Sequence, residues 1–137
     1  MLALVAGIGL PSCESSIGPD EFLVVGTLSE ETEPLPPIQV PDTVGVSQSL
    51  IVTVRTRGGG CERVGPTDVS VIGDSATITP YDFTRDPRSG VICDAILKVF
   101  EHVAEVSFVE SGAATVIVHT ADGLGSDKEH VFDVWVR

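Results

Sequence analysis

Apolar and polar residues alternate along most of the chain from residue 38 onward, and turn-forming residues separate the alternating stretches. In residues 48–57, for example, Leu50, Val52 and Val54 fall on one side of an extended chain while polar residues fall on the other. A repeat of two residues is typical of a half-buried β-strand. The pattern therefore predicts a strand over about 48–57, ended by a run of three glycines.

The same alternation predicts further strands between turns rich in Gly, Pro, Asp and Ser. These strands cover about 38–42, 68–72, 76–79, 102–109, 114–119 and 128–136, and residues 22–28 are a candidate first strand. Pro41 confines the first of them to an edge of the sheet, because proline has no N–H to donate. Pro80 is expected to end the strand that starts at Ala76, which leaves residues 80–97 irregular.

Residues 94–106 fit two patterns. Apolar residues recur at helical spacing from Ile96 to Phe100, and Asp94 is a candidate helix N-cap. From Ala104 onward, apolar residues alternate with polar ones, as they do in a strand. We favour a loop or a helical turn to about residue 100, followed by a strand.

Composition supports a β fold. The chain has 21 Val against nine Leu, and branching at Cβ suits a pleated sheet better than a helix. Short strands separated by turns at this spacing are typical of an antiparallel β-sandwich. We therefore predict an all-β domain of about seven or eight strands.

Charge narrows the choice of partners. The formal net charge is −12, and the first basic residue is Arg55. An acidic chain repels the phosphates of nucleic acids and the anionic surface of a membrane. We expect no nucleic-acid partner, and any attachment to a membrane has to come from a lipid.

The chain begins with an unbroken apolar run, residues 1–10, followed by Pro11-Ser12-Cys13 and then by polar residues. The run is about half of the ~20 residues that a membrane-spanning helix needs. An apolar run of this length before a small residue and a cysteine is typical of a bacterial lipoprotein signal, in which the cysteine becomes the lipidated N-terminus. An ordinary cleaved signal and a buried first strand are the alternatives.

We favour the lipoprotein signal, which divides the chain into three parts. Residues 1–12 are the signal, which is expected to begin further upstream because no Lys or Arg precedes the apolar run. Residues 13–37 are a tether, because their second half is acidic and rich in proline, and residues 38–137 are the domain. A lipid on Cys13 would hold the protein on a membrane outside the cytoplasm, in the periplasm or at the cell surface.

Cys61 and Cys93 remain if Cys13 carries a lipid. In an oxidising compartment the two are expected to form a disulfide, which would stabilise the fold by roughly 3.5–4 kcal/mol in the chain-entropy model. Two free thiols or a metal site are the alternatives, although no further Cys or His lies nearby at the spacing of a zinc site.

Three segments resemble bacterial immunoglobulin-like domains. Residues 108–118, Phe-Val-Glu-Ser-Gly-Ala-Ala-Thr-Val-Ile-Val, are similar to the strand–turn–strand signature of these domains. Residues 38–44 are similar to their first strand, and residues 50–54 to their second. With the Gly-Gly-Gly-Cys, Thr-Pro-Tyr and second Cys elements, the chain from about 22 to 137 resembles small bacterial lipoproteins of this type. The resemblance implies an immunoglobulin-like β-sandwich in the cell envelope and supplies no catalytic residue.

The chain departs from this family in one respect. In immunoglobulin domains, the disulfide joins two core strands and packs against a tryptophan. Here Cys61 and Cys93 both adjoin loops, and Trp135 lies in the last strand. The bridge is therefore expected to clamp loops at one end of the domain.

No catalytic motif stands out. The chain has no Gly-x-Ser-x-Gly elbow, and its triple glycine lacks the Gly-Lys-Ser/Thr ending of a phosphate-binding loop. His102, His119 and His130 are expected at the surface. Asp122 and Asp127, with Ser126, do not follow the pattern of a calcium-binding loop. We expect no enzyme activity, no cofactor and no metal site.

Two features suit binding. The irregular stretch after Pro80 places Tyr81, Phe83, Arg85 and Arg88 on a loop that the disulfide would hold, and such loops often carry function. Trp135 falls on the polar face of its strand. Either another segment such as 22–28 covers it, which we favour, or it is exposed as an anchor for a partner.

The sequence thus predicts a non-enzymatic module for binding or structural support, tethered in the cell envelope, with an envelope protein or a polysaccharide as its partner. A protease inhibitor that uses the same loops is the alternative, by analogy of fold alone. A small hydrolase, in which carboxylates or histidines converge in a pocket, is a remote alternative. The sequence does not specify the oligomeric state.

Overall fold

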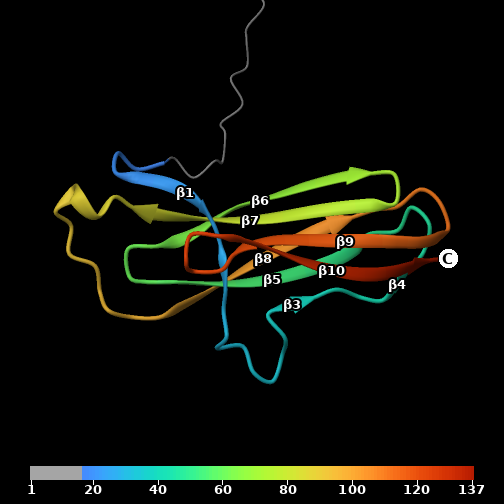
Figure 1. The fold of residues 1–137 in the computed structure, drawn as a ribbon, viewed down its shortest axis with the longest axis horizontal. Coiled ribbons are helices and arrows are strands. Elements are labelled where there is room, and N and C mark those ends of the chain that lie inside the picture. Colours follow the sequence, from blue (N-terminus) through green and yellow to red (C-terminus); the bar gives the residue numbers. More distant parts are fainter. Residues whose placement is uncertain (1–16) are drawn as a thin grey trace, which may run out of the picture.

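The computed structural model describes residues 17–137, and Cys13 lies outside that part together with the rest of residues 1–16. The described chain is all-β, as predicted (Figure 1). Its strands are β1 (Glu21–Val25), β2 (Thr27–Leu28), β3 (Ile38–Gln39), β4 (Thr43–Val44), β5 (Leu50–Gly58), β6 (Arg63–Ile72), β7 (Ser75–Arg85), β8 (Lys98–Val106), β9 (Gly112–Ala121) and β10 (Asp127–Val136). Within residues 17–137, the only helical element is a short 3-10 turn, Pro87–Ser89.

All ten strands belong to one curled sheet. In a first arm, β3 and β8 pair with β5, whereas β1, β4, β6, β7, β9 and β10 form a second arm. Strand β2 joins the arms, because it pairs with β5 on one side and with β9 on the other. The β10–β4, β2–β9 and β7–β9 pairings are parallel, so the prediction of a purely antiparallel sheet is wrong at these three contacts.

The hydrophobic core lies between the two arms. Leu50, Val52 and Val54 of β5 are fully buried, as their two-residue repeat predicted. From the second arm, alternate residues of β7, β9 and β10 point toward them, including Ile78 and Val116. Burial of these apolar side chains is the main favourable contribution to the stability of the fold.

Gly26 lies where the chain passes from β1 to β2. Its N–H donates to the carbonyl of Pro80 at 2.8 Å, and its carbonyl accepts from the N–H of Ala121 at 2.9 Å. A Cβ atom at this position would lie 2.5 Å from Cγ2 of Thr56 and 2.8 Å from Oδ2 of Asp82. The chain can cross this close to the other strands only because residue 26 has no side chain.

Two strands extend beyond their predicted limits. β7 continues through Pro80 to Arg85, although Pro80 was expected to end it. The register of β6 against β7 shifts between Val64 and Thr67, beside the pairing of Thr67 with Pro80. The missing N–H of Pro80 therefore falls where the ladder is already irregular. β8 begins at Lys98, and residues 94–97 form no helix.

The segment predicted as a tether is in large part built into the sheet. β1 pairs with β7 from Glu21 opposite Arg85 to Val25 opposite Tyr81. The Pro-rich segment 29–37 connects β2 to β3, and its first residue, Ser29, is buried. β1 and β2 occupy the candidate first strand at 22–28, so the sheet already begins at residue 21, ahead of the predicted boundary at residue 38.

Trp135 is not covered by residues 22–28. It lies opposite Ala113 of β9 and Thr43 of β4, whereas β1 pairs with β7. It is 56% exposed. The prediction that another segment covers Trp135 is therefore wrong.

Candidate functional site

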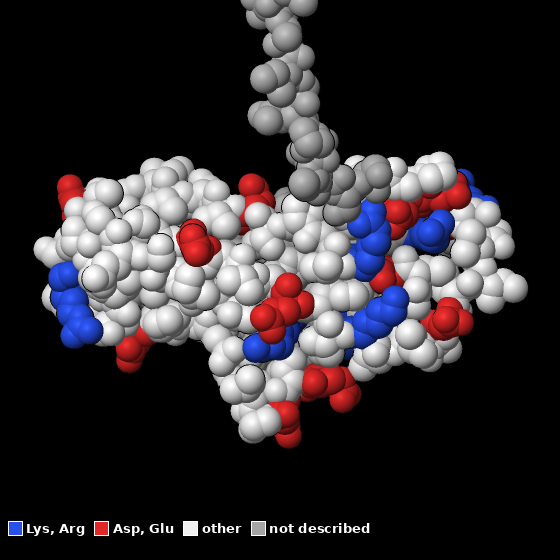
Figure 2. Space-filling view, turned by 180° about the vertical axis from the view of Figure 1, so that it is seen from behind, with Lys and Arg blue, Asp and Glu red and all other residues white. Residues whose placement is uncertain are grey.

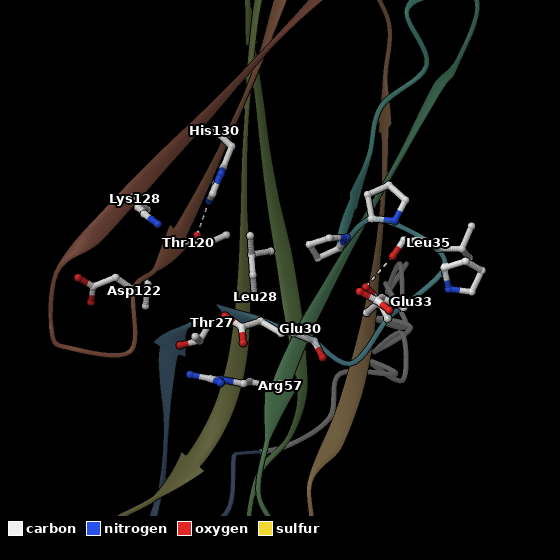
Figure 3. Close-up of a pocket in the computed structure, with 16 residues that line it drawn as sticks. Thr27, Leu28, Glu30, Glu33, Leu35, Arg57, Thr120, Asp122, Lys128 and His130 are labelled. Carbon is white, nitrogen blue, oxygen red and sulfur yellow. Dashed lines mark hydrogen bonds between the residues drawn. The ribbon is translucent and has the colours of Figure 1, made fainter.

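A groove of about 600 Å³ opens between the Pro-rich segment 29–37 and the hairpin that joins β9 to β10 (Figure 3). Leu28 and Thr27 of β2 lie between its two walls, with Arg57 below them (Figure 3). Because β2 pairs with both arms of the sheet, the groove lies where the arms meet. None of the residues that line it is Phe, Tyr or Trp.

Local hydrogen bonds shape the Pro-rich wall. The hydroxyl of Ser29 accepts from the N–H of Glu31 at 3.2 Å, and the hydroxyl of Thr32 donates to the carbonyl of Leu35 at 2.8 Å. Three prolines in the same wall restrict its backbone further. The wall is therefore formed before any ligand binds.

Asp122 shapes the opposite wall. One oxygen of its carboxylate accepts from the N–H of Leu124 at 2.7 Å and from the N–H of Ser126 at 3.0 Å. These two backbone hydrogen bonds hold the pKa of Asp122 below its ordinary value. The carboxylate that sequence analysis weighed as a calcium ligand thus organises the turn of the hairpin.

The Pro-rich wall is acidic, whereas the hairpin wall carries Lys128 as well as the carboxylate of Asp122. Lys128 and His130 project from the hairpin wall, and Glu30 and Glu33 belong to the Pro-rich wall (Figure 3). Burial lowers the pKa of His130, and the nearby Lys128 lowers it further. His130 is therefore neutral at neutral pH, and its Nε2 lies 2.9 Å from the hydroxyl of Thr120.

A second cluster of polar side chains lies inside the fold. Nε2 of His102 is 2.9 Å from Oδ1 of Asp82, and the hydroxyl of Thr56 donates to Oδ2 of Asp82 at 2.6 Å. Nδ1 of His102 lies 2.7 Å from the hydroxyl of Thr67. We call these four residues the buried polar network. They come from β5, β6, β7 and β8, so the network joins the two arms.

The order Thr67–His102–Asp82 is that of the nucleophile, base and orienting carboxylate in hydrolases. However, the side chains of His102 and Asp82 are only 1% and 2% exposed, so both are shielded from solvent. Each buried polar side-chain atom within residues 17–137 has a hydrogen-bond partner. This burial favours a structural role, and the prediction that His102 lies at the surface is wrong.

The structure brings Cys61 and Cys93 to disulfide distance, with their Cα atoms 5.1 Å apart. The four residues predicted to form a binding loop are not on one loop. Tyr81, Phe83 and Arg85 belong to β7, and Arg88 lies in the 3-10 turn beyond it.

Phe83 is buried. The guanidinium of Arg63 lies 3.8 Å from the centre of its ring, and Nε of Arg63 donates to Oε2 of Glu21 at 2.9 Å. This ion pair holds the pKa of Glu21 below its ordinary value. Within residues 17–137, no three His, Cys, Asp or Glu side chains converge in a way that could hold a metal ion.

No family model, curated protein or solved structure matches the chain. No helix in the described range 17–137 has both the length and the apolar character needed to cross a bilayer.

Sequence reasoning missed both the groove and the buried polar network. The alternation around His102 held a usable signal, because His102 lies two residues from Phe100 and from Ala104, both of which are buried. The groove had no such signal, because residues 27–37 and 120–130 are brought together only by the pairing of β2 with β9.

Proposed function

We propose that the chain is a non-enzymatic, immunoglobulin-like binding module that a lipid on Cys13 holds in the cell envelope. Two arms packed around a single core support an immunoglobulin-like sandwich. The buried polar network connects the two arms inside the fold, much as a disulfide connects the two sheets of an immunoglobulin domain.

The groove is the observation that carries a binding function. Both of its walls are preformed, and its base is a strand of the sheet, so binding would cost little conformational entropy. Apolar and polar groups are mixed in it, as they are in most ligand sites.

The lining of the groove favours a peptide over a polysaccharide. Sugar rings pack well on the flat faces of large aromatic side chains, and none of the lining residues is Phe, Tyr or Trp. Glu30 and Glu33 suit basic side chains of a ligand, whereas Lys128 and Arg57 suit acidic ones. We propose an extended segment of an envelope protein, with charges of both signs, as the ligand.

Selection from a random peptide library displayed on phage tests this proposal. Peptides selected on the wild-type domain are expected to lose at least about tenfold in affinity with Lys128→Glu or Glu33→Lys, because each change places like charges together. Asp74→Lys, a change of an exposed acid in the turn between β6 and β7, is the matched control and is expected to leave affinity unchanged. Peptides that bind all four proteins equally would place the binding site elsewhere.

Attachment through lipid is tested by the intact mass of the protein from membranes of its native host, measured without reducing agent. A chain that starts at Cys13, carries acyl mass and lacks two hydrogens is the expected result. An unmodified chain that starts at Met1 and has free thiols would contradict it.

A further inference from the structure

Several strand ends and loops meet at one end of the molecule. We call residues 17–23, 57–63 and 85–98 the loop end (left in Figure 1). The N–H of Asp86 donates to the carbonyl of Asp20 at 2.9 Å, and the N–H of Gly60 donates to the carbonyl of Asp94 at 3.2 Å. These bonds and the Cys61–Cys93 pair hold the three segments together.

The loop end exposes large aliphatic side chains. Ile92 is 95% exposed, and its neighbours Val91, Ile96 and Leu97 are also exposed. Ile92 lines the same surface hollow as Glu21, which shows that the exposed loop lies beside the start of β1. Contiguous exposed apolar side chains mark surfaces that contact a partner or a membrane.

Charge is distributed unevenly over the molecule. The loop end carries five acidic and five basic residues, whereas the rest of residues 17–137 carry fourteen acidic and three basic ones. Figure 2 shows most of the visible Lys and Arg side chains gathered toward this end, on the right in that view. An anionic membrane therefore repels the body of the domain but not its loop end.

The start of the described chain is at the same end. Cys13 precedes Ile17 by four residues, and four residues span at most about 14 Å. A lipid on Cys13 would therefore keep Ile17, and the loop end with it, close to the surface of the bilayer.

We propose that the loop end is a membrane-docking surface, in which Ile92 and the neighbouring aliphatic side chains enter the boundary between headgroups and acyl chains. This inference rests on the proposed attachment through Cys13. It assigns the exposed loop to a lipid surface and leaves the groove, which lies between the Pro-rich segment 29–37 and the β9–β10 hairpin, free to bind a peptide.

Fluorescence quenching tests the orientation. The ten strands of the described sheet lie within residues 17–137, so a chain that begins at Cys13 contains all ten. In the oxidised protein the thiol of Cys13 is the only free one, and it can be coupled to a maleimide lipid in vesicles of phosphatidylcholine and phosphatidylglycerol. Trp135→Phe removes the single native tryptophan. In that background, Ile92→Trp reports on the loop end, and Ile72→Trp, at the 78% exposed last residue of β6, is the matched control.

Lipids brominated in their acyl chains are expected to quench the tryptophan of Ile92→Trp about twofold, because docked apolar residues reach that boundary. The tryptophan of Ile72→Trp is expected to keep its emission. Equal quenching of both variants, or quenching of neither, would overturn the proposal. Inhibition of a protease by the wild type but not by Ile92→Asp, with no quenching, would also overturn it and would assign the loop to a protein partner.

The quenching experiment and the mass measurement test the two proposals independently of each other. The maleimide lipid replaces the native acyl chains, so quenching measures docking alone. An unacylated Cys13 in the native host would overturn the proposed attachment, whereas acylation without quenching would overturn only the docking surface.

Discussion

Nε2 of His102 in β8 lies 2.9 Å from Oδ1 of Asp82 in β7, and these two buried side chains come from opposite arms of the curled sheet. A buried carboxylate is costly unless it is paired and hydrogen-bonded. Asp82 meets that condition only while both His102 and Thr56 are in place. The contact therefore makes the packing of one arm depend on the other.

Loss of the imidazole is expected to weaken the fold strongly. His102→Leu should lower the free energy of unfolding by about 3–5 kcal/mol, because it leaves the carboxylate of Asp82 buried without this partner. Urea denaturation measures the change. His119→Leu is the matched control, since His119 is only partly buried and faces Glu129 at 3.6 Å. A similar loss in both variants would show that the network has no special role.

A methyl group at residue 26 is expected to disturb the same region. Gly26→Ala should cost about 1–3 kcal/mol, because its Cβ would overlap Thr56 and Asp82. In Gly59→Ala, the nearest atom to the new Cβ would be 3.5 Å away, so this variant is the control for removing a glycine as such. Thermal unfolding of the two variants should separate them, and equal melting temperatures would contradict the close crossing at Gly26.

Stability is expected to depend on pH through His130. Burial lowers its pKa in the folded state below the value of 6.5 that it has in the unfolded chain. Between these two values the unfolded chain binds a proton that the folded domain does not bind, so stability falls as pH is lowered through that window. His130→Gln should flatten the dependence below about pH 6.5, as urea midpoints at a series of pH values would show. An unchanged slope in this variant, or an equal effect of His119→Gln, would contradict the assignment to His130.

Removal of the first strands is expected to prevent folding. A chain that starts at Ile38, the boundary that the sequence predicted, lacks β1 and β2 and leaves one side of β7 and of β5 without those partners. A chain that starts at Ser16 retains the whole sheet. Circular dichroism and urea denaturation should show cooperative unfolding for the longer chain alone. Cooperative unfolding of the shorter chain would show that β1 and β2 are dispensable.

The two-residue repeat predicted the buried side of β5, β9 and β10, because burial of alternate residues is a local property of a strand. It failed at Pro80, since a neighbouring irregularity in β6 accommodates that residue and a single segment carries no record of its neighbours. The Pro-rich composition of residues 29–37 predicted a tether, but these residues connect two strands of the sheet, β2 and β3. Their contact with the sheet depends on β2 pairing with strands that are distant in sequence.

The buried polar network and the groove were harder to predict than the strands, because both depend on contacts between segments that are distant in sequence. Asp82 and Thr56 are 26 residues apart, and His102 is 20 residues beyond Asp82. No spacing rule links these three positions, and only the curl of the sheet brings them together. The groove likewise combines segments from both ends of the described chain.

The order in which the strands pair has a consequence for biosynthesis. β2 pairs with β9, and β4 pairs with β10. These two early strands lie within the first 44 residues and cannot gain those partners until residues 112–136 have been made. Such non-local pairings are slow to form, because a long loop has to close before they are gained. The sheet therefore cannot be completed before almost the whole chain has left the ribosome. A chain whose sheet is still incomplete can pass through a membrane channel in an extended form.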